Sequence, residues 1–255
     1  MTWKAIGHSA LGTSHISANK PCEDAIQYRI LQDANGAEVL ICCVSDGAGS
    51  AQYAAWASAF ATNTMAEGLS RLAVSDEQIS EGDIYALAED IYDGLECEAA
   101  LQGAELDEYS CTLLGCFITS NRAAFFQVGD GAIVRNDCSD FYTPVWWPHN
   151  GEYQNTTSFI IDDRSFSNLN ILILDEEVNE VAIFSDGLQL LALNTEGFTA
   201  HQPFFSDLFN YLRIANDPEK VNVLNRKLAE YLNSKPINDR TDDDKTLFLA
   251  TRLGS

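Results

Sequence analysis

The hydrophobic pattern of the chain consists mainly of short apolar runs separated by turn-prone stretches. Runs rich in β-branched and aromatic residues predict strands at Ala25–Leu31, Val39–Ser45, Thr112–Thr119, Ala123–Val128, Thr157–Ile161, Leu169–Leu174, Val181–Ser185 and Thr246–Thr251. Apolar residues at helical spacing predict helices at Ala51–Leu72, Ile84–Gln102, Leu188–Leu193, Pro203–Ile214 and Pro218–Asn233.

The order of these elements indicates an α+β fold. Two long helices lie between the early and the late strands, and more helix comes near the end of the chain. Many strands separated by turns favour antiparallel sheets, whose apolar faces must be covered. We therefore predict two packed antiparallel sheets flanked by helices, a four-layer α/β/β/α sandwich. The lack of internal repeats and of low-complexity linkers favours one domain over residues 1–255.

Composition and charge exclude several classes of protein. Hydrophobic residues make up 46% of the 255 residues, which predicts a folded globular chain. The formal net charge is −23, and 15 basic residues against 38 acidic ones cannot form much of a nucleic-acid-binding surface. No apolar run approaches the ~20 residues of a membrane helix, and the first residues lack a signal-peptide pattern. We expect a cytoplasmic protein with no nucleic-acid or membrane partner.

The seven cysteines follow no regular spacing and include no C-x-x-C pair. This pattern argues against a disulfide framework and against structural zinc. Cys42 and Cys43 lie within an apolar run, and Cys111 and Cys116 resemble strand residues. We predict that these four are buried thiols, which suits a reducing cytoplasm.

Acidic residues recur where apolar runs end or begin. Three runs finish on an Asp-Gly pair, at Asp46-Gly47, Asp130-Gly131 and Asp186-Gly187, while Glu23-Asp24 and Asp242–Asp244 precede strands. A single Asp-Gly pair usually marks only a turn. Repeated carboxylates gathered at strand ends would repel one another and would be costly to desolvate, and a shared cation removes that cost.

Oxygen ligands without His or Cys suit hard cations such as Mg²⁺ or Mn²⁺. Because Mg²⁺ keeps several waters and needs few carboxylates, so many acids predict more than one ion. Two ions ~4 Å apart would hold a bridging water, lower its pKa and clamp the oxygens of a phosphoryl group. The pattern therefore favours metal-assisted hydrolysis of a phosphoester.

Five motifs, taken together and in order, resemble a known family. They are GTSH…PCEDA, VSDGAGSAQYAAWAS, SCTLLG…FFQVGDG, FSDGLQLLA and TDDDKT, and they span Gly12 to Thr246. Each is weak alone, but their order resembles the metal-dependent protein phosphatases of type 2C, especially small single-domain bacterial members. The resemblance implies a β-sandwich of two antiparallel sheets flanked by helices, with a dinuclear metal site in a cleft at one end.

The resemblance also implies roles for the acidic residues. Asp46 would bridge both ions as the central catalytic carboxylate, and the Gly47 carbonyl would ligate one of them. Asp186 and Asp243 would complete the shell of the first ion.

The remaining acidic residues would serve further ions. Glu23 or Asp24 would hold the second ion, partly through water. Asp130 matches an aspartate that helps to hold a third, weaker ion in many bacterial relatives. Asp244 stands where the family often has Asn, and it would either add negative charge near the metals or point to solvent.

The chain departs from the family pattern at two further positions. Relatives usually carry a phosphate-binding Arg three residues after an early Gly, but here Gly12 leads to His15, and Lys20 is the only fixed cation between Gly12 and Glu23. Ala48 stands where eukaryotic relatives have a His proposed as general acid. We hypothesise that His15 binds phosphate or protonates the leaving group, because nearby negative charge favours a protonated imidazole. The alternative is a His that hydrogen-bonds backbone.

Aromatic residues mark a segment where relatives have a flap beside the cleft. Trp146-Trp147-Pro148-His149 and Gly151-Glu152-Tyr153 would either contact substrate or pack a loop against the sheets. The predicted function is a Mg²⁺/Mn²⁺-dependent serine/threonine protein phosphatase that uses a metal-bridging water. The alternatives are a non-catalytic regulatory or adaptor module that binds a phosphorylated partner, and a phosphoesterase for small molecules. We expect a monomer that acts on phosphorylated proteins opposite a cognate Ser/Thr kinase.

Overall fold

The computed structural model describes residues 2–75, 78–136, 141–148 and 157–253, and its strands form two five-stranded antiparallel sheets and one short hairpin. The sheets belong to different compact units. Unit 1 consists of Met1–Cys22, Gly131–Trp147 and Val178–Ser255, and unit 2 of Glu23–Asp130 and Pro148–Glu177. Each unit has its own sheet, helices and hydrophobic core.

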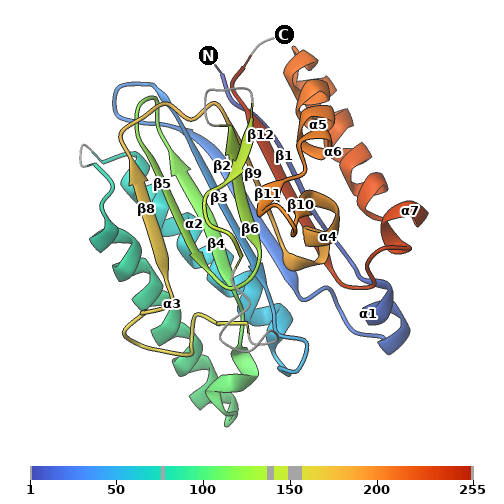
Figure 1. Ribbon diagram of the computed structural model, residues 1–255. Helices are drawn as coiled ribbons and strands as arrows, with labels where there is room; N and C mark the ends of the chain where they lie inside the picture. The colour runs from blue at the N-terminus through green and yellow to red at the C-terminus, as the bar shows by residue number, and fades with distance from the viewer. Residues whose placement is uncertain (1, 76–77, 137–140, 149–156, 254–255) are drawn as a thin grey trace. The chain divides into compact units, whose positions relative to one another are not determined.

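In unit 2, the sheet has the strand order β2-β3-β4-β5-β8, and helices α2 and α3 lie along it (Figure 1). The strands are β2 (Asp24–Gln32), β3 (Glu38–Asp46), β4 (Leu113–Ile118), β5 (Ala123–Val128) and β8 (Asn170–Leu174). The helices are α2 (Ala54–Ala73), α3 (Glu81–Gln102) and the 3₁₀ helix η1 (Leu106–Tyr109).

The core of unit 2 lies between one face of its sheet and these helices. Val39, Ile41 and Cys43 alternate along β3 and join that core, so the residues between them face the other side of the sheet. On α2, Ala57 and Ala61 are fully buried, so the helix presents small side chains where it packs on the sheet.

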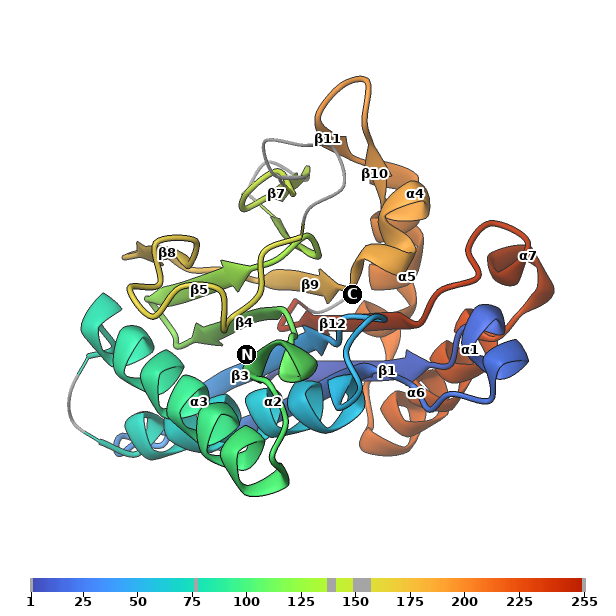
Figure 2. The same cartoon turned by 90° about the horizontal axis from the view of Figure 1, so that it is seen from below.

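In unit 1, the sheet has the strand order β1-β12-β9-β6-β7, and α5 and α6 lie beside it (Figure 2). The strands are β1 (Lys4–Ala10), β12 (Lys245–Thr251), β9 (Glu180–Phe184), β6 (Ala132–Asn136) and β7 (Tyr142–Pro144), with the hairpin β10 (Leu193–Asn194) and β11 (Thr199–Ala200). The helices are α1 (Thr13–Ala18), η2 (Asp186–Leu188), α4 (Gln189–Ala192), α5 (Gln202–Ile214), α6 (Pro218–Leu232) and α7 (Lys235–Asn238).

A buried ion pair ties the strands of unit 1 to α5. Glu180 is fully buried, and its carboxylate accepts hydrogen bonds from the Arg213 guanidinium and from the hydroxyls of Tyr142 and Thr251. Four donors satisfy the two oxygens, so the charge is compensated where water does not reach.

Most sequence-predicted elements are confirmed within a few residues, and one prediction is wrong. Thr157–Ile161 forms no strand, although Ile160 and Ile161 are buried and belong to the core of unit 2. These apolar side chains cover the core from a loop, in which the Ile160 N–H donates to the Cys111 carbonyl. The strand β1 was not predicted, because its Gly, His and Ser residues weaken the apolar pattern.

The predicted thiols Cys42, Cys43, Cys111 and Cys116 are all buried and free. Burial raises the pKa of the Cys111 and Cys116 thiols to about 12, so both stay protonated at neutral pH. In the described part of the chain, no helix combines the length and the apolar character that a membrane span requires.

Candidate functional site

The acidic residues of unit 2 meet where β2 begins and β3 ends. Asp24 and Asp46 are directly opposite each other in the antiparallel register, and both lie on the sheet face away from α2 and α3. Asp24 and the preceding Glu23 are buried, whereas Asp46 is half-buried. Like charges directly opposite on neighbouring strands repel, so the fold holds two carboxylates in an arrangement that favours a cation between or beside them.

Gly47 continues the chain out of β3 at a point with no room for a side chain. Its N–H donates to the Glu23 carbonyl at 3.0 Å, and it forms a bridge with Cys111. A Cβ atom at Gly47 would lie 2.7 Å from the Ala54 carbonyl oxygen at the start of α2. The glycine therefore allows the helix to begin directly behind the carboxylates.

Thr112, directly before the neighbouring strand β4, holds the backbone of Asp46. The Asp46 N–H donates to Thr112 Oγ1 at 2.9 Å, and the Thr112 N–H donates back to the Asp46 carbonyl at 2.8 Å. Asp130 follows β5, which ends at the same end of the sheet as β3, and its carboxylate accepts a hydrogen bond from the Thr157 hydroxyl. The structure thus brings all acidic residues predicted in unit 2 to one end of its sheet.

The acidic residues of unit 1 also collect at one sheet end. Asp186 follows β9, and Asp243 precedes β12, which pairs with β9. The Lys245 ammonium donates to the Asp243 carbonyl at 3.1 Å, although the lysine is fully buried. The sequence analysis did not identify Lys245 as a site residue. The only sign of its burial was its position at the start of an otherwise apolar strand.

His15 contacts Asp244 in the same unit. His15 Nδ1 lies 2.9 Å from Asp244 Oδ2, and the Gly12 N–H donates to Asp244 Oδ1 at 2.6 Å. Asp244 is 2% exposed, so the alternative in which it points to solvent is wrong. Two departures from the family pattern, a His for an Arg and an Asp for an Asn, therefore contact each other.

The predicted aromatic segment is only partly described. Trp146 and Trp147 are half-buried, and the Trp147 ring packs edge-on against Phe198, with the ring centroids 5.1 Å apart. His149, Gly151, Glu152 and Tyr153 lie outside the described residues. For Trp147, the contact with Phe198 favours the alternative in which the aromatic segment packs against the protein.

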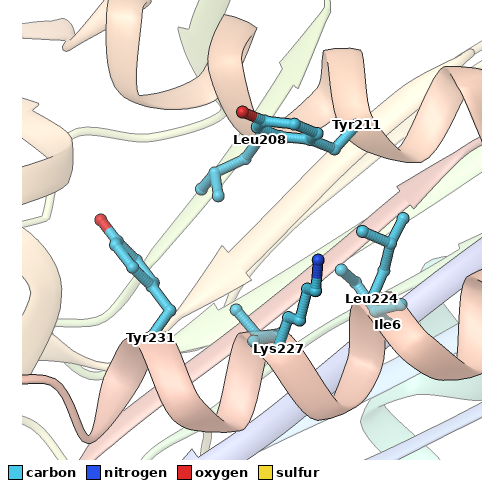
Figure 3. Close-up of a pocket in the computed structure, with 7 residues that line it drawn as sticks. Ile6, Leu208, Tyr211, Leu224, Lys227 and Tyr231 are labelled. Atoms are coloured by element: carbon cyan, nitrogen blue, oxygen red, sulfur yellow. The ribbon is translucent and has the colours of Figure 1, made fainter.

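A separate pocket of about 310 Å³ lies between α5 and α6 (Figure 3). Leu208 and Tyr211 of α5 face Leu224, Lys227 and Tyr231 of α6 across it. This lining is mainly apolar and includes none of the predicted metal ligands, so the pocket is distinct from the acidic sheet ends.

The donor set fits hard divalent cations. Glu23, Asp24 and Asp46 offer only carboxylate oxygens within one unit, and Mg²⁺ and Mn²⁺ prefer such ligands. Among the described residues of either unit, no three His, Cys, Asp or Glu side chains are gathered into a ready metal cluster. Mg²⁺ usually binds through one or two carboxylates and keeps several waters, which the opposed pair Asp24 and Asp46 can satisfy.

Comparison with known proteins decides the family. The profile of protein phosphatase 2C matches residues 11–233. The chain belongs to the protein phosphatase 2C family. Serine/threonine-protein phosphatase 3 of Escherichia coli (strain K12) is 35% identical over 252 residues, which cover 98% of this chain and 98% of the relative.

Solved structures of other proteins share the fold. The serine/threonine phosphatase Stp1 from Staphylococcus aureus is 16% identical with a TM-score of 0.62, over 100% of this chain and 96% of that one. RsbX, solved in complex with magnesium, is 15% identical with a TM-score of 0.56, over 98% and 94%. These likenesses confirm the predicted α+β fold, with its antiparallel sheets and flanking helices. As a protein phosphatase 2C, the protein is a phosphoprotein phosphatase, and the prediction of an enzyme is confirmed.

Proposed function

We propose that the protein is a Mg²⁺- or Mn²⁺-dependent phosphatase that hydrolyses phosphoserine and phosphothreonine in proteins. The observation that carries this proposal is the direct pairing of buried Asp24 with half-buried Asp46 beside buried Glu23, because carboxylates gathered in this way favour a cation. The name of the Escherichia coli relative supports the choice of phosphorylated serine and threonine, and the magnesium in RsbX supports the choice of metal.

In this proposal, the chain is one domain, and its acidic residues would hold two metal ions. Asp46 would be their central ligand, and a third, weaker ion is compatible with Asp130. The ligands would be Glu23, Asp24, Asp46, Gly47, Asp130, Asp186 and Asp243. Bound Mg²⁺ or Mn²⁺ supplies positive charge for the phosphoryl oxygens and makes water more acidic.

Water, rather than a side chain, is the proposed nucleophile. Its oxygen bonds to phosphorus and gives up a proton, while the bond from phosphorus to the serine or threonine oxygen breaks. The departing serine or threonine oxygen takes up a proton. Cys111, which pairs with Gly47, is unsuited to attack because burial raises the pKa of its thiol to about 12. His15 would bind the phosphoryl group or protonate the departing oxygen, as its contact with a buried carboxylate permits.

The test is phosphate release from a phosphothreonine peptide. We expect turnover with Mn²⁺, none with excess EDTA, and a loss of at least about 10²-fold in kcat/KM for Asp46→Asn. Asp90→Asn removes an exposed carboxylate from α3 and is the matched control, with turnover unchanged. Turnover that resists EDTA, or an Asp46→Asn variant as active as Asp90→Asn, would refute the metal-dependent mechanism.

The physiological setting proposed for this activity is the cytoplasm. A monomeric enzyme there would act on proteins phosphorylated by a cognate Ser/Thr kinase. Measuring the mass of the protein in solution tests the monomer.

A further inference from the structure

Asp244 uses its two carboxylate oxygens for two different donors of unit 1. Oδ1 accepts the Gly12 N–H at 2.6 Å, and Oδ2 contacts His15 Nδ1 at 2.9 Å. The Asp244 side chain is 2% exposed and that of His15 is 13% exposed. Water therefore has little access to either contact and does not readily replace it.

We propose that Asp244 is a positioning residue that fixes the orientation and the tautomer of the His15 imidazole through its contact with Nδ1. This inference rests on the proposed function, because it assigns the orientation of a residue that acts there. A carboxylate accepts hydrogen bonds, so the ring nitrogen that faces it carries a proton. A proton held at Nδ1 fixes the tautomer of the ring and the direction in which the ring faces.

Asn cannot replace Asp244 in this arrangement. The Gly12 N–H and the His15 Nδ1–H are both donors, whereas an amide offers one acceptor oxygen and one donor NH₂ group. If the amide oxygen accepts the Gly12 N–H, the NH₂ group faces Nδ1, and the ring must change to the tautomer that accepts there. If the amide is reversed, the Gly12 N–H loses its acceptor. Gly12 has little freedom to adapt, because a Cβ atom there would lie 2.4 Å from the Asp243 backbone carbon.

Asp244 also adjoins Asp243, one of the proposed metal ligands. The Asp244 N–H donates to Asp243 Oδ1 at 2.8 Å. A competing explanation is therefore that Asp244 acts on Asp243 and thereby on metal binding. The two explanations predict different results in the experiments below.

The first experiment observes the ring directly in the metal-free protein. The chain has four histidines, so ¹⁵N-histidine NMR spectra of the protein and of His15→Ala identify the His15 signals. We expect a protonated Nδ1 whose proton signal is shifted downfield, and we expect Asp244→Asn to abolish that shift. An unprotonated Nδ1, or a spectrum that Asp244→Asn leaves unchanged, overturns the proposal.

The second experiment is a double-mutant cycle of kcat and KM on a phosphothreonine peptide. Asp244→Asn should lower kcat/KM by about tenfold in the natural protein and by less than about twofold in the His15→Ala background. Asp242→Asn, at an exposed neighbour, is the matched control and should change neither value. An equal loss in both backgrounds overturns the proposal, because Asp244 would then act independently of His15.

Two further measurements separate the remaining explanations. The Mn²⁺ concentration for half-maximal activity should be the same with and without Asp244→Asn, and recovery of the variant by excess Mn²⁺ would assign the effect to Asp243 instead. His15→Asn keeps a donor for Asp244 but lacks the imidazole, so it should unfold at the same temperature as the natural protein and have the same reduced kcat/KM as His15→Ala. A natural protein without phosphatase activity would refute the proposed function, whereas the Nδ1 proton would still decide whether Asp244 holds His15.

Discussion

Replacing Asp24 by Asn should make the metal-free protein more stable while weakening its response to metal. Directly opposed residues on antiparallel strands have Cβ atoms about 4.5–5.5 Å apart. Two unit charges about 5 Å apart repel by about 0.8 kcal/mol in bulk water and by about 3 kcal/mol at an effective dielectric constant of about 20. Because Asp24 is 7% exposed and Asp46 is half-buried, we expect removal of one charge to stabilise the metal-free protein by about 1–3 kcal/mol.

The same substitution removes a proposed metal ligand. Metal at about 100 times its dissociation constant stabilises a native protein by about 2.7 kcal/mol, and tenfold weaker binding reduces that gain to about 1.4 kcal/mol. The variant should therefore be more stable than the natural protein in EDTA but gain less stability from Mn²⁺.

Thermal unfolding in EDTA and in Mn²⁺ measures both effects. In a chain of this size, each kcal/mol shifts the unfolding temperature by about 2–4 °C. Asp90→Asn, which removes an exposed charge from α3, is the control and should show neither effect. If Asp24→Asn unfolds at a lower temperature than the natural protein in EDTA, or if its shift with Mn²⁺ is undiminished, the electrostatic reasoning is wrong.

Three other predictions concern the backbone, the thiols and the charge of the protein. Gly47→Ala should destabilise the fold by about 1–3 kcal/mol in urea unfolding and reduce phosphate release, because its Cβ would collide with the Ala54 carbonyl; unchanged stability would contradict the close approach. Burial raises the pKa of Cys111 and Cys116 from 9.0 to about 12, so the folded state keeps protons that the unfolded chain loses above pH 9. The stability from these thiols is complete below pH 9 and falls as pH rises towards 12, by about 1.4 kcal/mol per pH unit for each thiol; in urea unfolding at pH 8 and pH 10, Cys111→Ala should therefore lose less stability than the natural protein. Finally, the net charge of −23 should favour basic over acidic sequence around the phosphosite, with a preference in kcat/KM that weakens as salt rises; equal rates at low salt would exclude it.

The strands predicted best from the sequence are those whose residues are buried at every position. In β5, for example, all six residues from Ala123 to Val128 are buried, and the predicted and observed bounds agree. The strand β1 was missed because its stability comes from pairing with β12, residue by residue from Lys4 to Ala10. A local apolar pattern does not contain information about such long-range pairing. Thr157–Ile161 is the opposite case, because its two isoleucines are buried but pair with no strand.

In the candidate site, too, the sequence indicated single residues, and the structure showed which of them lie together. The sequence marked Asp46 and Asp24 as acids at strand ends, but only the register of β2 and β3 sets them opposite each other. It marked His15 as a departure from the family and left the role of Asp244 open. The contact between them joins residues 229 positions apart. Lys245 escaped notice because its burial becomes visible only when the ends of β9 and β12 are paired.

The sequence by itself determined which residue types stand where strands end, and hence the family and the class of chemistry. Those features are local, because an apolar run that ends at an Asp-Gly pair can be recognised without knowing which segments lie beside it in the fold. The tertiary structure decided which carboxylates oppose each other within a sheet, which donors share Asp244, and which charges are buried. Those features depend on the pairing of segments far apart in the chain, and electrostatic energy depends on distance in space and on access to water rather than on position in the sequence.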